Sequence, residues 1–279
     1  MPSTIKLSAA VITFNEEENI ERCLKSLVDV SDEIVIVDSF STDRTEELCK
    51  KYGAKFYQHE FMGYKEQKSF ALEMASNDYI ISLDADEALS EEMKQSVLKA
   101  KANWKHDGHS FNRLNNYCGQ WIFHSNWYPD RKVRLFDRRK GFWGGVNPHD
   151  KFTMDRSAST KHLKGDLLHW VIDSYEDHIQ RANNFSSIAA QEYFKMGKTT
   201  NPVSMSLRFM WHFFKGYVLR GGFRDGYNGF VICAVSAHES FLKYLKLRQL
   251  NLDANRVKLN TRVIKGIKIA GEANNQKNK

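Results

Sequence analysis

Apolar runs alternate with amphipathic segments through the first hundred residues of the chain. Short runs rich in Val, Ile and Leu, such as "EIVIV", have the length and composition of buried strands. The expected order is strand 7–13, helix 17–28, strand 33–37, helix 42–52, strand 54–57, helix 64–75 and strand 79–83. Continuous apolar strands that alternate with helices predict an α/β fold with a mainly parallel sheet, covered by helices on both faces.

The remainder of the chain changes character twice. Residues 103–164 show no clear periodicity and are rich in aromatic residues, Arg and Asn, which predicts an irregular, substrate-binding section. A long amphipathic helix is expected over 173–196, and beyond Pro202 the composition becomes aromatic and cationic. We therefore predict an α/β domain over 1–200, with halves at about 1–102 and 103–200, and a helical extension over 201–279 with a frayed polar end, "GEANNQKNK".

The segment "YIISLDADEAL" places three carboxylates, those of Asp84, Asp86 and Glu87, where an apolar strand ends. Like charges this close raise one another's pKa, so a positive partner is expected. Asp84 and Asp86 face the same way, because alternate strand residues do, and carboxylate oxygens suit a divalent metal. The bland alternative is a solvated turn that caps a helix beginning near Ser90.

Two other polar clusters follow predicted strands: one at Thr13, Phe14 and Asn15, and one at Asp38 and Ser39. Ligands of parallel sheets bind outside the carboxyl ends of the strands, so the clusters should meet at one edge, which favours the metal over the cap. The chain has neither a GxGxxG after its first strand nor a GxxxxGK[ST] motif. It therefore lacks the phosphate cradle of dinucleotide dehydrogenases and P-loop enzymes, and a metal would have to provide the counter-charge for a nucleotide diphosphate.

Composition narrows the partners and the compartment. The hydrophobic content of 42% supports a packed core, and the net charge of +7 favours anionic partners such as nucleotide diphosphates or phospholipid surfaces. Nucleic acid ranks last, because no nucleic-acid-binding motif is present. The four cysteines form no CxxC pair, which suits a reduced cytoplasm. We expect no signal peptide and no membrane crossing, since no run approaches the roughly 20 apolar residues of a membrane span.

Three blocks in this order, "AAVITFNEEENIERCLKSL", "DEIVIVDSFSTDRTEEL" and "YIISLDADEAL", resemble the opening of a family 2 glycosyltransferase with a GT-A fold. The later blocks "YPDRKVRLFDRRKGFWGGVNPHDKF" and "GDLLHW" resemble the bacterial branch of β-1,4-glucosyltransferase type that extends the lipopolysaccharide core. The similarity spans roughly residues 5–245. It implies an inverting enzyme that moves a hexose, with glucose as the leading candidate, from a UDP-sugar to a lipid-linked saccharide with the help of Mg²⁺ or Mn²⁺.

The resemblance implies a nucleotide-binding role for six residues: Thr13, Phe14, Asn15, Asp38, Lys68 and Asp84. Phe14 stands where many relatives have Tyr, so stacking on uracil is kept and a hydroxyl contact is lost. By resemblance, Asp38 would accept the uracil N–H, Lys68 would face the nucleotide and Asp84 the ribose. Ser69 replaces the Asn that is common after the lysine.

The resemblance also implies Asp86 as a metal ligand and Asp150, in "NPHDKF", as the general base. A metal stabilises the negative charge that develops on the leaving diphosphate, and a general base typically contributes about 10²–10⁴-fold in rate. Relatives of this branch often show His-Glu at this position, so the shorter Asp150 alters the reach of the carboxylate. The alternative for Asp150 is an ion pair with Lys151 in a turn.

Four further residues each have two interpretations. His169, after an apolar run, is either a metal ligand or a structural histidine. Arg131 and Arg134 suit either the diphosphate or an anionic acceptor. Trp143, beside two glycines, is either a sugar-stacking platform or a core residue.

The segment "SLRFMWHFFKGYVLRGGFRDGYNGF" interleaves aromatic residues with Arg and Lys. Such a segment suits a helix that lies among anionic lipid headgroups, or a helix packed on the catalytic domain, or both. The first interpretation predicts a cytoplasmic enzyme bound peripherally to the inner face of the cytoplasmic membrane, where a lipid-linked acceptor would be found.

Two rival functions remain open at this stage. A phosphatase with an aspartyl nucleophile also has Asp-x-Asp after a strand, but there the pair usually follows the first strand and not the fourth. A non-catalytic sugar- or lipid-binding module would keep the aromatic residues and would not need both Asp86 and Asp150. Release of phosphate without a sugar nucleotide would favour the phosphatase.

Overall fold

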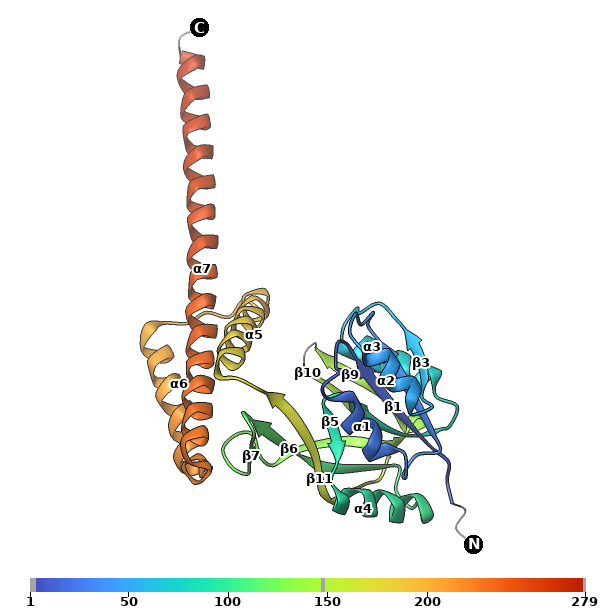
Figure 1. Cartoon of the computed structure of the whole chain (residues 1–279). Coiled ribbons are helices and arrows are strands. Elements are labelled where there is room, and N and C mark those ends of the chain that lie inside the picture. The colour runs from blue at the N-terminus through green and yellow to red at the C-terminus, as the bar shows by residue number, and fades with distance from the viewer. Residues whose placement is uncertain (1–3, 147–148, 278–279) are drawn as a thin grey trace. The chain divides into compact units, whose positions relative to one another are not determined.

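The computed structural model describes residues 4–146 and 149–277, which form two compact units (Figure 1). The sheet unit contains the chain up to Phe123 together with Trp127–Asp173, and the helical unit contains His124–Asn126 and the chain from Ser174 onwards. The division therefore lies at residue 173, whereas composition placed it near residue 200. The difference arises because helix α5 (Tyr175–Lys195) packs along helix α7 (Gly226–Lys277).

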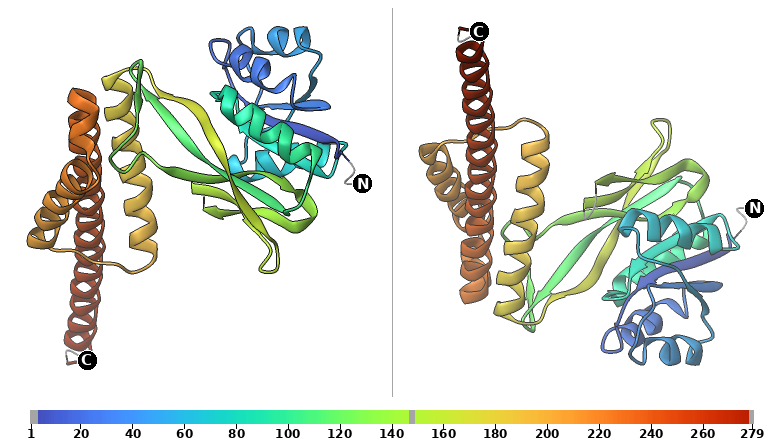
Figure 2. Two further views of the ribbon diagram at one scale, coloured as in Figure 1. Left: turned by 90° about the horizontal axis from the view of Figure 1, so that it is seen from below. Right: turned by 90° about the horizontal axis from the view of Figure 1, so that it is seen from above.

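A mixed sheet forms the centre of the sheet unit. Among the described residues its order is β3-β2-β1-β4-β8-β6-β11-β5, with β7 paired to β6. Its strands are β1 (Leu7–Thr13), β2 (Glu33–Asp38), β3 (Lys55–Gln58), β4 (Tyr79–Asp84), β5 (Glu87–Leu89), β6 (Gly108–Tyr117), β7 (Gln120–Ile122), β8 (Asp130–Asp137) and β11 (Thr160–Ile172). Strands β1 to β4 are parallel, as are the long neighbours β6 and β11 (Figure 2), whereas β5, β7 and β8 run antiparallel to theirs.

The core lies on both faces of this sheet because the apolar residues of each strand alternate between them. In β1, Leu7, Ala9 and Val11 pack on one face, against helices α1 (Ile20–Leu27) and α4 (Glu91–Ala102). Ala10 and Ile12 pack on the other face, against α3 (Tyr64–Met74) and the hairpin of β9 (Gly141–Val146) and β10 (His149–Met154). The α/β prediction and the helix cover are thereby confirmed.

The strands and helices expected before residue 84 are all present, with boundaries that differ by at most three residues. Helix α2 (Thr45–Lys51) begins after the predicted start, because Asp38 and Asp43 hold the intervening residues in turns. Helix α4 is capped by Ser90, whose hydroxyl accepts a hydrogen bond from the Met93 amide at 3.3 Å. Ser90 therefore supplies the cap, and the three carboxylates before it do not.

The prediction that residues 103–164 are irregular is wrong. The described residues of this range form β6 to β10, the start of β11 and the short 3₁₀ helix η1 (Arg138–Lys140). Strand β6 reads "GHSFNRLNNY", in which polar residues interrupt the apolar ones, so the alternation of a half-buried strand is hidden. The β11 strand carries a further irregularity between His162 and Asp166, where Gly165 adopts a φ of 87° against the backbone of α4.

The helical unit contains α5, α6 (Pro202–Phe214), the π-helical turn η2 (Lys215–Leu219), the 3₁₀ turn η3 (Gly222–Asp225) and α7. Helix α6 begins with Asn201 and Ser204 bonded reciprocally as a capping box, and Pro202 occupies its first turn. Helices α5 and α6 both pack against α7 (Figure 1). Lys246 Nζ of α7 donates hydrogen bonds to three oxygens of α5: the Asn183 carbonyl oxygen, Ser186 Oγ and Ser187 Oγ. Each of these bonds is 2.7 Å long.

Helix α7 continues to Lys277, whereas the sequence predicts a frayed end from residue 271. Within the described residues, no helix combines the length and the apolar character that a membrane crossing requires. The four cysteines are free, and Cys23 is fully buried in α1.

Candidate active site

The carboxyl end of β4 carries a buried cluster of opposite charges. The Asp84 carboxylate lies 3.0 Å from Lys68 Nζ on α3 and 3.1 Å from Arg134 Nη2 on β8. Burial alone would raise the pKa of Asp84, but Lys68 and Arg134 outweigh it and hold that pKa well below the usual value. The sequence predicts a positive partner for the acid cluster, and the structure provides two.

Glu87 completes this cluster, although the sequence does not indicate a role for it. Its side chain is fully buried, and its carboxylate lies 3.2 Å from Arg134 Nη2 and 3.3 Å from Arg113 Nη1. The other oxygen of Glu87 accepts a hydrogen bond from the Asp84 amide, which fixes the turn after β4. Two carboxylates, of which Glu87 is fully buried and Asp84 partly exposed, and two arginines therefore lie close together, a pattern that single motifs in the sequence do not reveal.

Arg134 reaches this cluster because β8 contains a bulge at its position. Val133 pairs with Ser110 and Leu135 pairs with His109, so Arg134 is an extra residue between two consecutive partners. Bulges of this kind redirect a side chain and are common beside active sites. Burial would lower the pKa of Arg134, but the Glu87 and Asp84 carboxylates raise it instead, so the guanidinium is a fixed positive charge.

Asp150 joins the cluster from the hairpin β9–β10. Its carboxylate lies 2.9 Å from Lys68 Nζ, and the exposed fractions of the two side chains are 9% and 3%. Among the described contacts, Asp150 therefore pairs with Lys68 and not with Lys151, which was the alternative. One ammonium group links the candidate base to Asp84, the carboxylate that the resemblance assigns to the donor.

Asp86 and His169 face each other on the opposite side of the turn, with 3.3 Å between Asp86 Oδ2 and His169 Nε2. Asn115 Nδ2 donates to the Trp127 carbonyl, so Asn115 Oδ1 is an acceptor, and His169 Nδ1, 2.6 Å away, carries the proton. The Nε2 lone pair of a neutral His169 then points at a carboxylate oxygen. A nitrogen lone pair and a carboxylate oxygen repel each other at this distance, so a cation or a second proton must lie between them.

This arrangement fits a divalent metal. Histidine ligands usually donate their other ring N–H to a neighbouring acceptor, as His169 does to Asn115. Asp86 Oδ1 is buried without a hydrogen-bond partner, which leaves one carboxylate oxygen available. The part of the chain that the structure describes contains no group of three or more His, Cys, Asp and Glu side chains arranged for a metal, so further ligands would come from substrate phosphates and water.

The ends of β1 and β2 form the adjoining section of the same edge. Thr13 is buried there, Phe14 is 55% exposed, and Asn15 has a left-handed φ of 52°. Asn15 Oδ1 accepts from the Thr42 amide, which joins the two loops. Asp38 is buried and accepts from the Ser41 amide at 2.8 Å, so its carboxylate orders the loop after β2. The three predicted clusters do meet at one edge of the sheet.

Phe40 and Glu16 also belong to this edge, and sequence analysis assigned neither of them. Phe40 is 54% exposed at a φ of 62°, a conformation that is uncommon for a residue other than glycine and concentrates at functional sites. Burial raises the pKa of Glu16 to about 7, and the negative charge of Asp86 raises it as well, whereas a hydrogen bond from Asn19 lowers it. The sequence of residues 15–18, "NEEE", does not indicate that one of these acids is half-buried.

Trp143 lies in the apolar layer beneath the charges and is 6% exposed. Its ring packs edge-on to Phe136 and Phe152, and Lys68 Nζ lies 5.0 Å from the ring centroid. The structure thus places Trp143 in the core, in agreement with the interpretation as a core residue and not with that as a sugar-stacking platform. Arg131, by contrast, is exposed and makes no ion pair among the described residues, so it is not brought into the cluster.

Several buried polar atoms at this edge lack hydrogen-bond partners within the described structure. They are Thr13 Oγ1, Asp86 Oδ1, Arg134 Nε, Arg134 Nη1 and Trp143 Nε1. Buried polar groups in folded proteins are nearly always satisfied, and each exception calls for an explanation such as a ligand or ion. Thr13 ends β1, Asp86 follows β4 and Arg134 contacts Asp84, so these atoms indicate that a polar ligand binds at this edge.

The model for "Glycosyl transferase family 2" matches residues 8–163, more than half of the chain. The chain belongs to glycosyl transferase family 2. A glycosyltransferase of Rickettsia bellii, described as uncharacterised, is 32% identical over 266 residues, which cover 90% of this chain and 89% of that protein. LpsC, a lipopolysaccharide core biosynthesis glycosyltransferase of Rhizobium meliloti, is 29% identical over 252 residues, covering 88% and 93% of the two chains.

Among solved structures, TarS 1–349 of S. aureus is similar over 90% of this chain and 92% of its own, at 15% identity and a TM-score of 0.45. Membership of the family makes the protein a glycosyltransferase and confirms the resemblance on which the candidate residues were chosen. The α/β sheet, the helices on both of its faces and the C-terminal helices agree with the predicted GT-A fold.

Proposed function

We propose that this family 2 glycosyltransferase is an inverting enzyme that transfers a hexose, with glucose as the leading candidate, from a UDP-sugar to a lipid-linked saccharide such as lipopolysaccharide core. The observation that carries the proposal is the group of unpartnered buried polar atoms at the carboxyl edge of the sheet. They lie beside a carboxylate, Asp150, that shares a lysine with Asp84. A donor site and a base side by side are the two parts that group transfer requires.

The donor would bind across the loops that follow β1, β2 and β4. The exposed ring of Phe14 is available to stack on uracil, and Phe40 offers a second exposed ring at the same edge. Asn15 and Asp38 hold these loops in place, and Asp38 would accept the uracil N–H at a carboxylate that already accepts from Ser41. Asp84 would contact the ribose, with Lys68 and Arg134 fixing its position.

Asp86 and His169 would hold a Mg²⁺ or Mn²⁺ ion, which stabilises the charge of the departing diphosphate as a Lewis acid when bound. Their fit rests on the tautomer of His169 and on the unpartnered oxygen of Asp86. The unpaired N–H groups of Arg134 would add hydrogen bonds to phosphate oxygens, since a guanidinium is well suited to this.

In the transfer step, Asp150 takes the proton of the acceptor hydroxyl while that oxygen forms a bond to the anomeric carbon. The bond from the anomeric carbon to the phosphate oxygen breaks, its electron pair leaves with UDP, and the configuration inverts. Lys68 holds the Asp150 side chain in position for this step, because its ammonium group lies 2.9 Å from the carboxylate.

The helical unit supports the membrane part of the proposal. Helix α6 and the turn after it expose a row of apolar side chains, here called the apolar stripe: Val203, Leu207, Met210, Trp211, Phe214 and Val218. Four exposed cations accompany the stripe, here called the cationic set: Arg208, Lys215, Arg220 and Arg224. Apolar side chains with cations beside them suit a helix that lies in an anionic membrane surface, such as the inner face of the cytoplasmic membrane.

A screen of UDP-hexoses with Mg²⁺ or Mn²⁺ tests the enzymatic part of the proposal. We expect UDP release from at least one UDP-sugar, slow in water and faster with a lipid-linked saccharide, and abolished by EDTA. Full activity in chelator would remove the metal role of Asp86 and His169. Release of phosphate from simple phosphate esters, without any turnover of sugar nucleotides, would instead support a phosphatase.

A further inference from the structure

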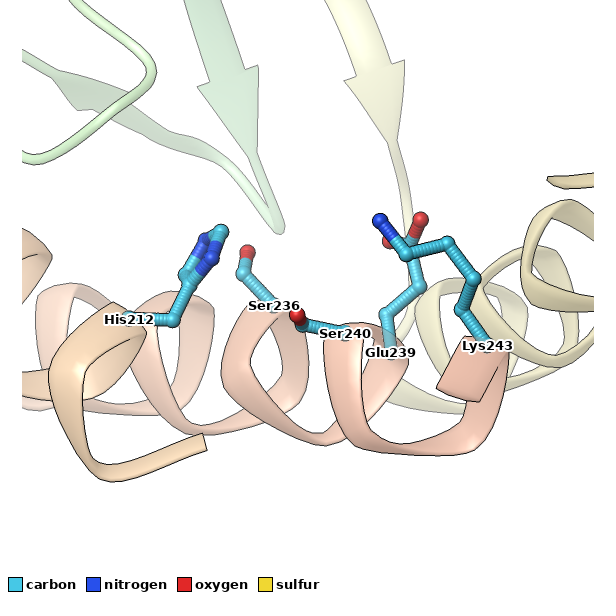
Figure 3. A pocket seen from close by; sticks show the side chains of 5 residues that line it. All are labelled: His212, Ser236, Glu239, Ser240 and Lys243. Atoms are coloured by element: carbon cyan, nitrogen blue, oxygen red, sulfur yellow. The ribbon is translucent and has the colours of Figure 1, made fainter. Parts of the chain in front are cut away.

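A polar pocket lies between α6 and α7, within the helical unit and apart from the residues assigned above. It has a volume of about 230 Å³ and is lined by His212 of α6 and by Ser236, Glu239, Ser240 and Lys243 of α7 (Figure 3). Figure 3 shows Ser236, Glu239 and Lys243 pointing to the same side of α7, with His212 reaching in from α6. All five lining side chains carry hydrogen-bonding groups, which is unusual for the space between two packed helices.

The charges around the pocket favour an anion. Lys243 Nζ lies 5.0 Å and 4.9 Å from the ring centroids of Tyr193 and Tyr244, and makes no ion pair among the described residues. Burial lowers the pKa of His212, and Lys243, together with two members of the cationic set, lowers it further. Burial raises the pKa of Glu239, and the positive charge of Lys243 opposes this effect. Three cations, Lys243, Lys215 and Arg220, thus act on His212, against the single carboxylate of Glu239 in the pocket.

The pocket and the apolar stripe lie on opposite sides of α6. His212 follows Val203 by nine residues, which is two and a half turns of an α-helix, so the two side chains point in opposite directions. Val203 is 69% exposed, whereas Met205, near the side of His212, is 5% exposed. An α-helix with its side chains is about 10–12 Å across, so a membrane on the stripe leaves the pocket on the water side. A lipid phosphate beneath the stripe does not reach it.

We propose that the pocket between α6 and α7 binds an acidic sugar unit of the acceptor, with Lys243 contacting its phosphate or carboxylate and Ser236 and Ser240 contacting its hydroxyl groups. The pocket volume of about 230 Å³ is below the roughly 300–1,000 Å³ of typical small-molecule sites. The pocket therefore suits a ligand of the size of one sugar unit. The proposal rests on the proposed function, which makes the acceptor a saccharide. It adds a recognition site outside the part of the chain that handles the donor.

The test measures binding of glucose 6-phosphate and glucuronic acid to the full-length protein by calorimetry, in the presence of saturating UDP so that the donor site is filled. Glucose and inorganic phosphate serve as the neutral and the sugar-free probes. The variants are Lys243→Gln and Ser240→Ala, with Arg248→Gln as the matched control. Arg248 lies on the same helix, makes no ion pair among the described residues and does not line the pocket.

We expect at least one acidic sugar to bind at least tenfold more tightly than glucose and than inorganic phosphate. Lys243→Gln should weaken that binding at least tenfold and Ser240→Ala about threefold to tenfold, whereas Arg248→Gln should stay within twofold of the parent protein. Thermal unfolding and circular dichroism check that each variant is folded. Ser240→Ala keeps every charge, so it tests the pocket even if Lys243→Gln is destabilised by loss of its aromatic contacts.

Equal binding by the parent protein and both pocket variants overturns the proposal, as does the absence of binding by either acidic sugar at millimolar concentration. Inorganic phosphate binding as tightly as the sugar phosphate would show an anion site without sugar recognition, and also overturns it. Hydrolysis of UDP-sugars separates this outcome from failure of the proposed function. Lys243→Gln should retain hydrolysis, so a protein that hydrolyses UDP-sugars but ignores acidic sugars loses only the pocket proposal.

Discussion

Replacing Asp150 with asparagine tests the proposed mechanism most directly, because it removes the base and keeps the size of the side chain. The change also takes one of two carboxylates from Lys68, which is 3% exposed. Lys68 keeps Asp84 at 3.0 Å, and the asparagine amide oxygen still accepts a hydrogen bond. The full cost of about 3–5 kcal/mol for an unpaired buried charge is therefore not expected.

We estimate the loss of stability at about 1.5–3 kcal/mol, the usual contribution of a hydrogen bond to a charged group. For a unit of this size, each kcal/mol lowers the melting temperature by about 2–4 °C, so the variant should remain folded at 25 °C. Turnover should fall by at least about 10²-fold, the lower end of the effect of a general base. The Kd for UDP-sugar should change by less than about threefold, because Asp84, Lys68 and Arg134 stay in place.

Asp130→Asn is the matched control. The Asp130 carboxylate lies 2.9 Å from Arg113 Nη2, and Arg113 keeps Glu87 at 3.3 Å, so the control also removes one of two carboxylates from a cation of the same cluster. It should leave turnover within about tenfold of the parent enzyme. Asp150→Glu should retain much of the activity, since it keeps the carboxylate.

The assay measures UDP release and, separately, donor binding by calorimetry. Unchanged turnover in a folded Asp150→Asn protein would refute the assignment of the base. A loss of donor affinity that accounts for the whole loss of activity would give Asp150 a different role, in which it positions Lys68 and takes no proton.

Three further changes test other parts of the structure. Asn115→Leu removes the acceptor that fixes the His169 tautomer, and we expect a 10–100-fold weaker Kd for Mn²⁺, measured by electron paramagnetic resonance with UDP present; an unchanged Kd would exclude His169 as a ligand. Replacing the cationic set with glutamine should weaken binding to anionic vesicles at low salt, and parent-like sedimentation with vesicles would show that α6 is only a packing helix. Lys55, Ser8 and Ser76 outweigh burial and lower the pKa of Glu33 to about 2, so Glu33 stabilises the fold above pH 4.5 and this contribution is lost as the pH falls towards 2. Glu33→Gln should therefore cost about 1–3 kcal/mol of unfolding free energy at pH 7 and nothing near pH 2, as denaturant titrations would show.

The sequence predicted the parallel half of the sheet well because its strands are buried on both faces and read as uninterrupted apolar runs. It failed for β6, whose residues Asn112, Asn115 and Asn116 mix with apolar ones. Asn115 binds His169 and Asn112 binds Tyr128, so these polar side chains have partners that are distant in sequence. A strand that supplies such contacts loses the alternation by which strands are recognised.

The candidate site shows the same division. Asp84 and Asp86 could be found because they follow an apolar strand, whereas Lys68 and Asp150 were indicated only by the resemblance; the structure brings Asp84, Lys68 and Asp150 together. Glu87 was visible as a third carboxylate, but its burial between two arginines depends on how β5, β6 and β8 pair. Nothing local in the sequence distinguishes Arg134, which is buried, from Arg131, which is exposed, because the bulge that separates them forms only when β8 pairs with β6.

That bulge has a consequence for insertion and deletion in β8. Val133 and Phe136 pack with one apolar cluster and Leu135 with the other, so the alternation of the strand is regular once Arg134 is left out of the count. Loss of this one codon would keep the pairing of β8 with β6 and leave both apolar clusters filled, while Asp84 and Glu87 would lose a shared counter-charge. The sheet can therefore form without Arg134, whereas the two carboxylates need its positive charge. We expect relatives that lack this arginine to lack one of the two acids as well.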